Sequence, residues 1–254
     1  MPLIFGQLGA AGFDVRATYH ADAILREHFP EALAELEPSL LEVEVPVEEL
    51  IRSGGGVAQV TQRLRRRLNG IGWLKAQFRI EKTINDRTTF AQSHEVDHTK
   101  VFESGTIALE IEWNNKDPFF DRDLENFNRL HADGAISVGL IITRGQSLQD
   151  QLESAIRAYA AANGVASYED LRHLGISPTA RQQAMVERQT RDGVRSFADA
   201  WAHAFVADKF GTATTHWSKL AARLDRGVGS PCPLVAIGIP FSCVTDVSIP
   251  IRNA

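Results

Sequence analysis

The sequence predicts an α/β protein with a mixed central β-sheet flanked by helices, and three observations support this prediction. Residues 96–102 and 105–113 are two strand-like segments joined by a short turn that contains glycine, as in a β-hairpin. Residues 135–143 are nearly all apolar, which is typical of a central strand covered on both faces. Strands and helices then alternate along the chain, and this order favours a mixed sheet.

The region before the hairpin contains two expected helices and one expected strand. Apolar residues recur at helical spacing over residues 20–36, and Pro30 should break or kink that helix. Residues 40–45 alternate between apolar and acidic side chains, which predicts a strand. Residues 53–56 (SGGG) indicate a flexible link, and residues 57–69 then predict a basic amphipathic helix.

The region after the hairpin is mostly helical, and we expect one domain over residues 1–254. A buried strand is expected near the C-terminus, followed by a short tail at the surface. The expected helices span residues 123–131, 147–162, 178–190, 194–208 and 214–225. The expected strand is 234–239, and the expected tail is 241–254.

Composition excludes several classes of protein. The chain has 254 residues, of which 44% are hydrophobic and 23% charged, so a folded globular domain is expected. We expect no membrane association, because no long apolar run and no secretory signal are visible. Cys232 and Cys243 are too few for a disulfide scaffold and suit a reducing cytoplasm. A net charge of −5 argues against a histone-like DNA coat, but it is compatible with a nucleic-acid enzyme that has a carboxylate-rich centre.

Two glutamates in the second strand of the hairpin are the first candidate site residues. Glu110 and Glu112 stand two residues apart, so in a strand both project to the same face. Like charges side by side are unfavourable unless a cation lies between them, and a hard cation such as Mg²⁺ prefers carboxylate ligands. Asp97, on the preceding strand, would complete such a cluster. The alternative from the residues alone is a solvated strand face.

A longer string around these carboxylates resembles a known family. It comprises Glu95-Val-Asp97, Ala108-Leu-Glu-Ile-Glu-Trp-Asn-Asn-Lys-Asp117, Asp121-Arg-Asp-Leu124 and the strand end Ile141-Ile-Thr-Arg144. These residues resemble the type II restriction endonucleases of the BamHI/BglII branch of the PD-(D/E)xK nuclease superfamily, and the segment WNNKDPFFDRDL is similar to BglII in particular. The resemblance covers about residues 94–146 and implies a restriction endonuclease-like core.

The resemblance implies a role for each acidic residue. Asp97 takes the position of the first metal-binding aspartate, and Glu110 that of the second metal ligand. Glu112 stands where most of the superfamily has lysine, and Glu81 lies at about the distance of an additional active-site residue upstream. The chain departs from the strict motif because Val96 replaces the usual proline and residue 112 is not lysine.

The implied reaction is the Mg²⁺-dependent hydrolysis of a phosphodiester in double-stranded DNA. One or two Mg²⁺ ions would bind Asp97 and Glu110 and neutralise the scissile phosphate, and a water molecule would be the nucleophile. Glu112 would orient or deprotonate that water or would hold a second metal ion. Both roles remain open at the level of the sequence.

Recognition of DNA bases requires amides and guanidinium groups at base edges. Asn114, Asn115, Arg122 and Arg144 all lie just past the expected catalytic strands, and we expect them to contact DNA. The resemblance places a base-reading asparagine at residue 115 and recognition residues near Arg144. The basic run at residues 62–68 has two interpretations, phosphate contact or a solvated face paired with acidic residues of 42–49.

The resemblance also implies an assembly and an organisation of the chain. Enzymes of this branch cut palindromic sites as homodimers with one active site per strand, and relatives share a GATC core. The catalytic core is expected at about residues 75–165. Residues 166–254 are expected to be helical additions plus a further strand, which form a DNA-recognition or dimer subdomain.

Two other functions fit parts of the sequence. His94, Glu95 and His98 match the HExxH pattern of zinc metalloproteases, which requires a helix that places both histidines on one face. The strand-like residues that follow argue against such a helix. A DNA-binding regulator that does not cleave is the second alternative, but its phosphate-binding surface would not need three acidic residues, which repel DNA in the absence of a metal.

Overall fold

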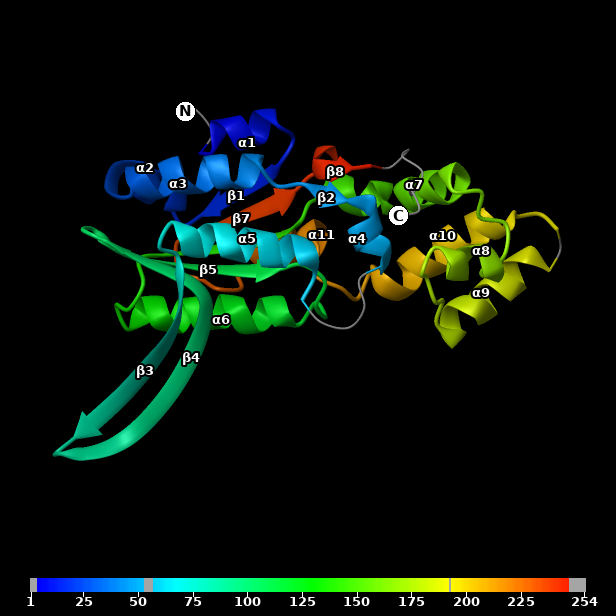
Figure 1. The fold of residues 1–254 in the computed structure, drawn as a ribbon. Helices are drawn as coiled ribbons and strands as arrows, with labels where there is room; N and C mark the ends of the chain where they lie inside the picture. The colour runs from blue at the N-terminus through cyan, green and yellow to red at the C-terminus, as the bar shows by residue number, and fades with distance from the viewer. Residues whose placement is uncertain (1–3, 53–56, 192, 247–254) are drawn as a thin grey trace.

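A six-stranded mixed sheet forms the centre of the molecule (Figure 1). The structure is a computed structural model that describes residues 4–52, 57–191 and 193–246. The three central strands run parallel to one another, and the outer strands pair antiparallel with their neighbours. In spatial order the strands are β1 (Asp14–Thr18), β7 (Leu234–Ile239), β6 (Val138–Arg144), β5 (Gly105–Glu112), β4 (Arg87–Phe102) and β3 (Leu74–Ile84). The predicted fold class is therefore confirmed.

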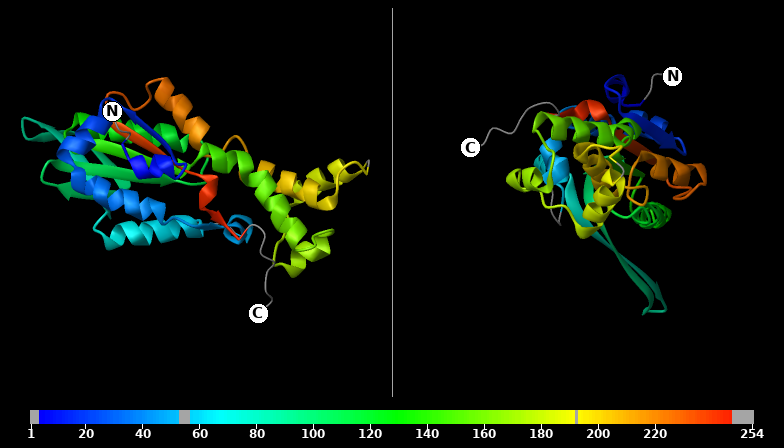
Figure 2. Two further views of the ribbon diagram at one scale, coloured as in Figure 1. Left: turned by 90° about the horizontal axis from the view of Figure 1, so that it is seen from above. Right: turned by 90° about the vertical axis from the view of Figure 1, so that its right-hand side faces the viewer.

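The pairing between β4 and β5 ends where the candidate site begins. The two strands are in register from Phe102 opposite Gly105 to His98 opposite Leu109. Beyond His98, β4 pairs only with β3, and the two strands project from the sheet as a two-stranded arm, residues 76–96 (Figures 1 and 2). This separation opens space between Asp97 on β4 and Glu110 on β5.

Helices cover both faces of the sheet. One face packs against the N-terminal helices and α7, and the other against α6 and α11. A helical lobe of α8, α9 and α10 extends beyond the sheet (Figure 2). The helices are α1 (Gly6–Ala10), α2 (Ala21–His28), α3 (Pro30–Leu41), α4 (Val47–Arg52), α5 (Gln59–Gly70), α6 (Phe119–Ala132), α7 (Gln146–Ala162), α8 (Tyr168–His173), α9 (Ala180–Thr190), α10 (Phe197–Lys209), α11 (Trp217–Asp225) and the 3₁₀ helix η1 (Phe241–Cys243). A short parallel pair, β2 (Val45–Pro46) and β8 (Val244–Thr245), lies outside the sheet.

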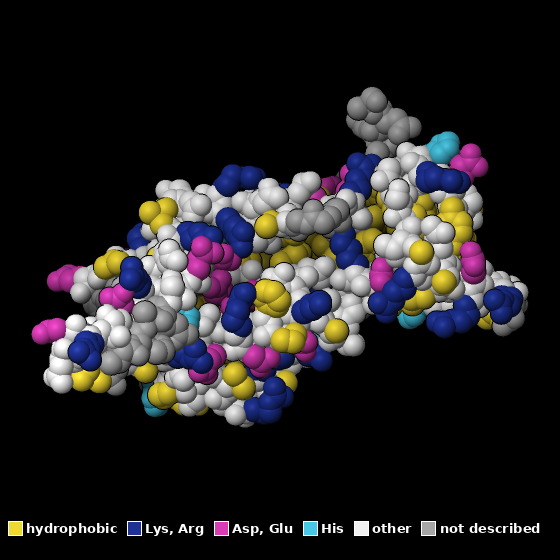
Figure 3. Space-filling view, turned by 90° about the horizontal axis from the view of Figure 1, so that it is seen from below, with side chains coloured by type: hydrophobic (Ala, Val, Ile, Leu, Met, Phe, Trp, Pro, Cys, Tyr) yellow, Lys and Arg dark blue, Asp and Glu magenta, His cyan; other side chains and the backbone are white. Residues whose placement is uncertain are grey.

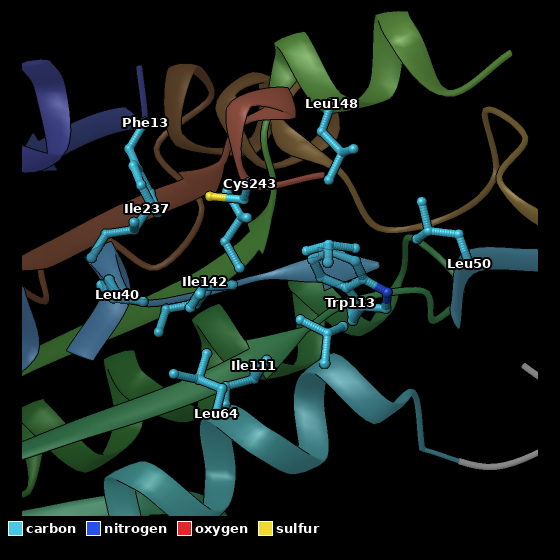
Figure 4. Close-up of a cluster of buried hydrophobic side chains, with 14 of the residues drawn as sticks. Phe13, Leu40, Leu50, Leu64, Ile111, Trp113, Ile142, Leu148, Ile237 and Cys243 are labelled. Atoms are coloured by element: carbon cyan, nitrogen blue, oxygen red, sulfur yellow. The ribbon is translucent and has the colours of Figure 1, made fainter. Parts of the chain in front are cut away.

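Strand alternation divides the core into two layers. Leu109 and Ile111 of β5 point into the larger layer, which also contains Trp113, and Ile111 lies near Leu64 of α5 (Figure 4). Ala108, the neighbour in β5, points to the opposite layer and packs with the apolar face of α6. The residues at even positions of β5 therefore face α6, and this row continues into Glu110 and Glu112.

Most of the expected elements are present, with shifted ends. The helix expected at 20–36 is interrupted at Phe29, and Pro30 is the first residue of α3, as its missing N–H and fixed φ allow. The strand expected at 40–45 is wrong except at Val45, where the short strand β2 begins, because the helical row of buried Leu36 and Leu40 extends α3 to Leu41. The expected link at 53–56 and the last residues of the expected tail lie outside the described residues.

Both ends of the chain contribute to the central sheet. β1 comes from the N-terminal region, and β7 comes from the segment 166–254 together with the helical lobe. Residues 75–165 thus provide the strands that carry the candidate site but only part of the sheet. Within the parts of the chain that the structure describes, no helix has the length and apolar character needed to cross a bilayer.

Candidate active site

The structure brings together three of the predicted acidic residues. Asp97, Glu110 and Glu112 line a cavity of about 360 Å³ at the point where β4 and β5 separate. The two glutamates are only 6% and 3% exposed. Asp123 of α6 is 1% exposed and adds a fourth carboxyl to this acidic cluster, because its charge acts on both glutamates. We name Asp97, Glu110, Glu112 and Asp123 the acidic cluster.

Local sequence explains why these side chains meet. Glu110 and Glu112 continue the row that begins with buried Ala108, so they face α6 rather than solvent. Asp123 lies between Phe120 and Phe127 on the buried face of α6. The strand and the helix therefore each place acidic groups at positions that would elsewhere be apolar.

Burial makes ionisation of the acidic cluster unfavourable. Loss of solvent raises the pKa of Glu110 to about 9, and the charges of Asp123 and Asp97 act in the same direction. The backbone N–H of Asp97 donates to Glu110 and opposes this rise in pKa. Burial also raises the pKa of Glu112 to about 8 and raises the pKa of Asp123. The cluster thus holds more carboxyl groups than its surroundings can stabilise as anions.

Three polar side chains compensate part of this charge. Asn115 Nδ2 donates to Glu112 Oε2 at 2.7 Å. Arg122 Nε donates to Asp123 Oδ1 at 2.8 Å, and Arg122 Nη2 lies 3.5 Å from Glu112 Oε1. On the other side, Arg65 Nη2 of α5 bonds Asp97 Oδ2 at 2.5 Å. The predicted residues Asn115 and Arg122 therefore lie next to the predicted catalytic acids.

The donor set of this cluster fits a hard divalent cation. All its ligand atoms are carboxylate oxygens, and Asp123 Oδ2 is buried without a hydrogen-bond partner. Among the described residues, no three histidine, cysteine or acidic side chains already converge on one metal position. A cation here would thus take part of its coordination from substrate oxygens and water, as Mg²⁺ usually does.

Two predicted site residues lie elsewhere. Glu81 projects from the two-stranded arm, where it pairs with Arg79 and does not line the cavity. Arg144 has no exposed surface, and it donates to Trp113 O at 2.9 Å and to Thr215 O at 2.8 Å. Because Arg144 is buried and bonded internally, it cannot contact a base edge in this structure. Its contacts instead fix the segment after β5, which carries Asn114 and Asn115.

The zinc protease alternative is contradicted by the backbone. The HExxH pattern lies within strand β4 and not on a helix. His94 and His98 are four residues apart in a strand, which separates them by about 13 Å along its axis. Glu95 is exposed and pairs with Lys75 on β3. These residues do not form a zinc site of the protease type.

Two residues of the site were not predicted as active-site residues. Asp123 was part of the quoted string but received no role, although its place on the apolar face of α6 could have indicated one. Arg65 belongs to the basic run of α5, whose neighbours Arg63 and Arg67 pair with Glu49 and Glu42. The solvated-face interpretation is therefore confirmed for Arg63 and Arg67, whereas Arg65 contacts the site.

Fold and site together define a class of protein. A buried acidic cluster at a split in a mixed sheet, beside amide and guanidinium groups, is the arrangement of a metal-dependent nuclease that cuts phosphodiesters. Residues 13–239, most of the chain, match the family of restriction endonuclease BglII/BglIII, and the chain belongs to this family. It is a type II restriction endonuclease, a site-specific deoxyribonuclease, and enzymes of this kind generally use a divalent metal. No curated protein matches the chain.

Proposed function

We propose that this endonuclease uses Mg²⁺ to hydrolyse double-stranded DNA at a palindromic site and that it acts as a cytoplasmic homodimer. The observation that carries the proposal is the acidic cluster, whose buried oxygens line a cavity next to Asn115 and Arg122. A GATC core in the recognition site follows from the family resemblance alone.

Asp97 and Glu110 are the residues that would hold the metal ion. When bound, the ion would neutralise the scissile phosphate and make the attacking water more acidic. Glu112 is fixed from two sides, by the Asn115 amide and by Arg122. This fixation supports a role in which Glu112 orients the water and accepts its proton. Arg122 would offset negative charge that builds on the phosphate.

Asn114, Asn115 and Arg122 would contact DNA at the edge of the cavity. Asn115 and the side chain of Arg122 are exposed, so both can reach a substrate that covers the site. The two-stranded arm and the helical lobe extend on opposite sides of the site region (Figure 1). We propose that the lobe, within residues 166–254, recognises DNA or forms the dimer contact.

A dimer follows from the symmetry of the substrate. A palindromic duplex has a two-fold axis, so two copies of one active site related by the same axis cut one strand each. Within the described residues, one protomer contains one acidic cluster, and one such cluster would be enough to cut one strand of the DNA.

Digestion of supercoiled plasmid with sequencing of the ends tests this proposal. Mg²⁺ should give discrete fragments with identical end sequences, and EDTA should leave the plasmid intact. Asp97→Ala and Glu110→Ala should each lower cleavage at least about 1,000-fold, because both remove a ligand for the stabilising charge. The matched variant Glu125→Ala alters an exposed carboxyl on α6 and should cut normally.

Two results would contradict the proposal. Normal cleavage by Glu110→Ala would show that the acidic cluster is not catalytic. Site-specific binding by the wild-type protein without any cleavage in Mg²⁺ would instead identify a DNA-binding regulator.

A further inference from the structure

A buried carboxylate holds one of the cations that line the catalytic cavity. Arg122 lines this cavity, and its side chain is 54% exposed. Asp123 Oδ1 accepts from Arg122 Nε at 2.8 Å and from Arg122 Nη2 at 2.7 Å. Asp123 itself is 1% exposed and does not line the cavity. Asp123 can therefore act on a substrate only through another residue.

The contact between Arg122 and Asp123 is not an automatic result of helix geometry. Consecutive residues of a helix do not face each other, so the side chain of Arg122 must curve around α6 to reach Asp123. The ring of Phe119 supports this path, because Arg122 Cζ lies 4.4 Å from the ring centroid. The ring and the carboxylate together fix one conformation of a long side chain, which would otherwise sample many rotamers.

The fixed guanidinium of Arg122 keeps donors for a further partner. Arg122 Nη2 lies 3.5 Å from Glu112 Oε1, so the guanidinium bridges Glu112 and Asp123. In the part of the chain that the structure describes, no group accepts from Arg122 Nη1. Figure 3 shows the molecule from below, the side on which α6 lies in Figure 1, and Lys and Arg side chains lie among Asp and Glu side chains there. A phosphate that approaches this face can accept from Arg122 Nη1.

Asp123 contributes little to the fold apart from this contact. It lies between Phe120 and Phe127 on the buried face of α6, where an apolar side chain would pack at lower cost. Its Oδ2 is buried without a partner, and among the described residues only Arg122 donates to its side chain. A buried carboxyl kept at this cost indicates a function for its one partner.

We propose that Asp123 is a positioning residue, which holds Arg122 in the catalytic cavity so that Arg122 meets the scissile phosphate without rearrangement. The inference rests on the proposed nuclease function. A donor that is fixed before the substrate arrives stabilises the charge that develops on the phosphate better than a mobile donor, because it needs no ordering during the reaction. Loss of Asp123 should therefore slow the chemical step, while Arg122 keeps its charge and its access to DNA.

The variant Asp123→Leu separates this role from a structural one. Single-turnover cleavage of plasmid in Mg²⁺ at increasing protein concentration gives a maximal rate and a half-maximal concentration. The maximal rate should fall about 100-fold, and the half-maximal concentration should change by less than about threefold. The melting temperature in EDTA should rise by about 2–4 °C, because leucine replaces a buried charge. A residue with a structural role alone would instead lower the melting temperature.

Two single variants calibrate this result. Asp123→Asn keeps an oxygen that accepts from Arg122, so its maximal rate should fall only about tenfold. Asn128→Leu is the matched control, because Asn128 also lies on α6 and has a buried oxygen without a partner, but does not line the cavity. Asn128→Leu should leave both kinetic values unchanged.

A double variant tests whether Asp123 acts through Arg122. Arg122→Met removes the guanidinium, so Asp123 then has no side chain to position. Arg122→Met and Arg122→Met/Asp123→Leu should therefore cut at the same maximal rate, although Asp123→Leu alone causes a large loss. This comparison decides the question even if Asp123→Leu changes stability in an unexpected direction.

Each outcome gives a decision. DNA that the wild-type protein leaves uncut overturns the nuclease proposal and this inference with it. A wild-type maximal rate in Asp123→Leu overturns the positioning role and leaves the nuclease proposal standing. Losses that multiply in the double variant do the same, because they would show that Asp123 acts independently of Arg122.

Discussion

Glu110 occupies a position where the strand pattern of β5 would otherwise place an apolar side chain. Its burial costs stability when it is charged, and the same burial prepares the carboxyl group for a cation. Asp123 repeats this conflict on α6, where it lies between two buried phenylalanines. Such violations of the hydrophobic pattern are expected at functional sites, which trade stability for chemistry.

The acidic cluster predicts an unusual pH dependence of stability in the metal-free protein. The pKa of Glu110 is raised on folding, so the folded state keeps a proton that the unfolded chain loses above about pH 4.5. The free energy of unfolding should therefore fall as pH rises from 6 towards 9, by on the order of a few kcal/mol for Glu110 and Glu112 together. Urea unfolding in EDTA measures this slope.

A charge-removing variant provides the control for that slope. Glu110→Gln should flatten the dependence, and Mg²⁺ should flatten it in the wild-type protein, because both relieve the unfavourable negative charge. Glu125→Gln, on the exposed side of α6, should keep the wild-type slope. A slope that Glu110→Gln leaves unchanged would show that this carboxyl does not carry the effect.

Arg144 illustrates a structural role where sequence reasoning expected DNA contact. Arg144→Met would leave Trp113 O and Thr215 O without a buried donor, at a cost of about 1–3 kcal/mol for each group. Stability and cleavage should fall together, because the segment that carries Asn114 and Asn115 loosens. Urea unfolding and plasmid digestion measure both quantities. Normal stability combined with weak DNA binding would instead support the original base-reading role.

At the scale of elements, the separation of β4 from β5 creates the site. The hairpin was predictable, because its two strands flank a glycine turn at residue 105 and contain alternating side chains. The two-stranded arm was not predicted, although β3 and β4 are consecutive strands joined by a two-residue turn at Asn85 and Asp86, both with positive φ, which is a local hairpin signal. The sequence therefore predicted that Glu110 and Glu112 share a strand. It also placed Glu81 in the site, whereas Glu81 lies on the two-stranded arm.

The packing of α6 on the sheet gives a test at this scale. Gly139 of β6 faces α6, and a Cβ atom there would lie 2.5 Å from Phe127 Cδ2. Gly139→Ala should lower the free energy of unfolding by about 1–3 kcal/mol through overpacking. The double variant Gly139→Ala/Phe127→Leu should recover part of that loss. Gly70→Ala, where a Cβ atom meets nothing within 4 Å, should change stability little; a similar loss at both positions would contradict this account.

At the scale of the whole molecule, fold class and the central strands were predictable because nearly continuous apolar runs mark β6 and β7. The contributions of Asp123 and Arg65 could not be predicted, because each depends on which helix packs against which strand. The local pattern around Asp97, Glu110 and Glu112 also fitted a solvated strand face. The family resemblance, and not that pattern, assigned catalytic roles to these three residues.

The proposed homodimer makes a prediction that needs no structural method. When wild-type protein is mixed with excess Glu110→Ala protein and allowed to exchange subunits, mixed dimers contain one working site. These dimers should convert supercoiled plasmid to the nicked circle, because each site cuts one strand. Linear product alone, at a rate that falls only with dilution of the wild-type protein, would indicate that one protomer cuts both strands.

The position of the metal ion is the most direct test of the central claim, that the acidic cluster binds the catalytic cation against DNA. Crystals of the protein with a cleavable duplex, soaked in Mn²⁺, would locate the ion by anomalous scattering. We predict a peak at about 2.0–2.2 Å from carboxylate oxygens of Asp97 and Glu110 and from a phosphate oxygen. A peak away from both residues, in crystals where the DNA has been cut, would contradict the account.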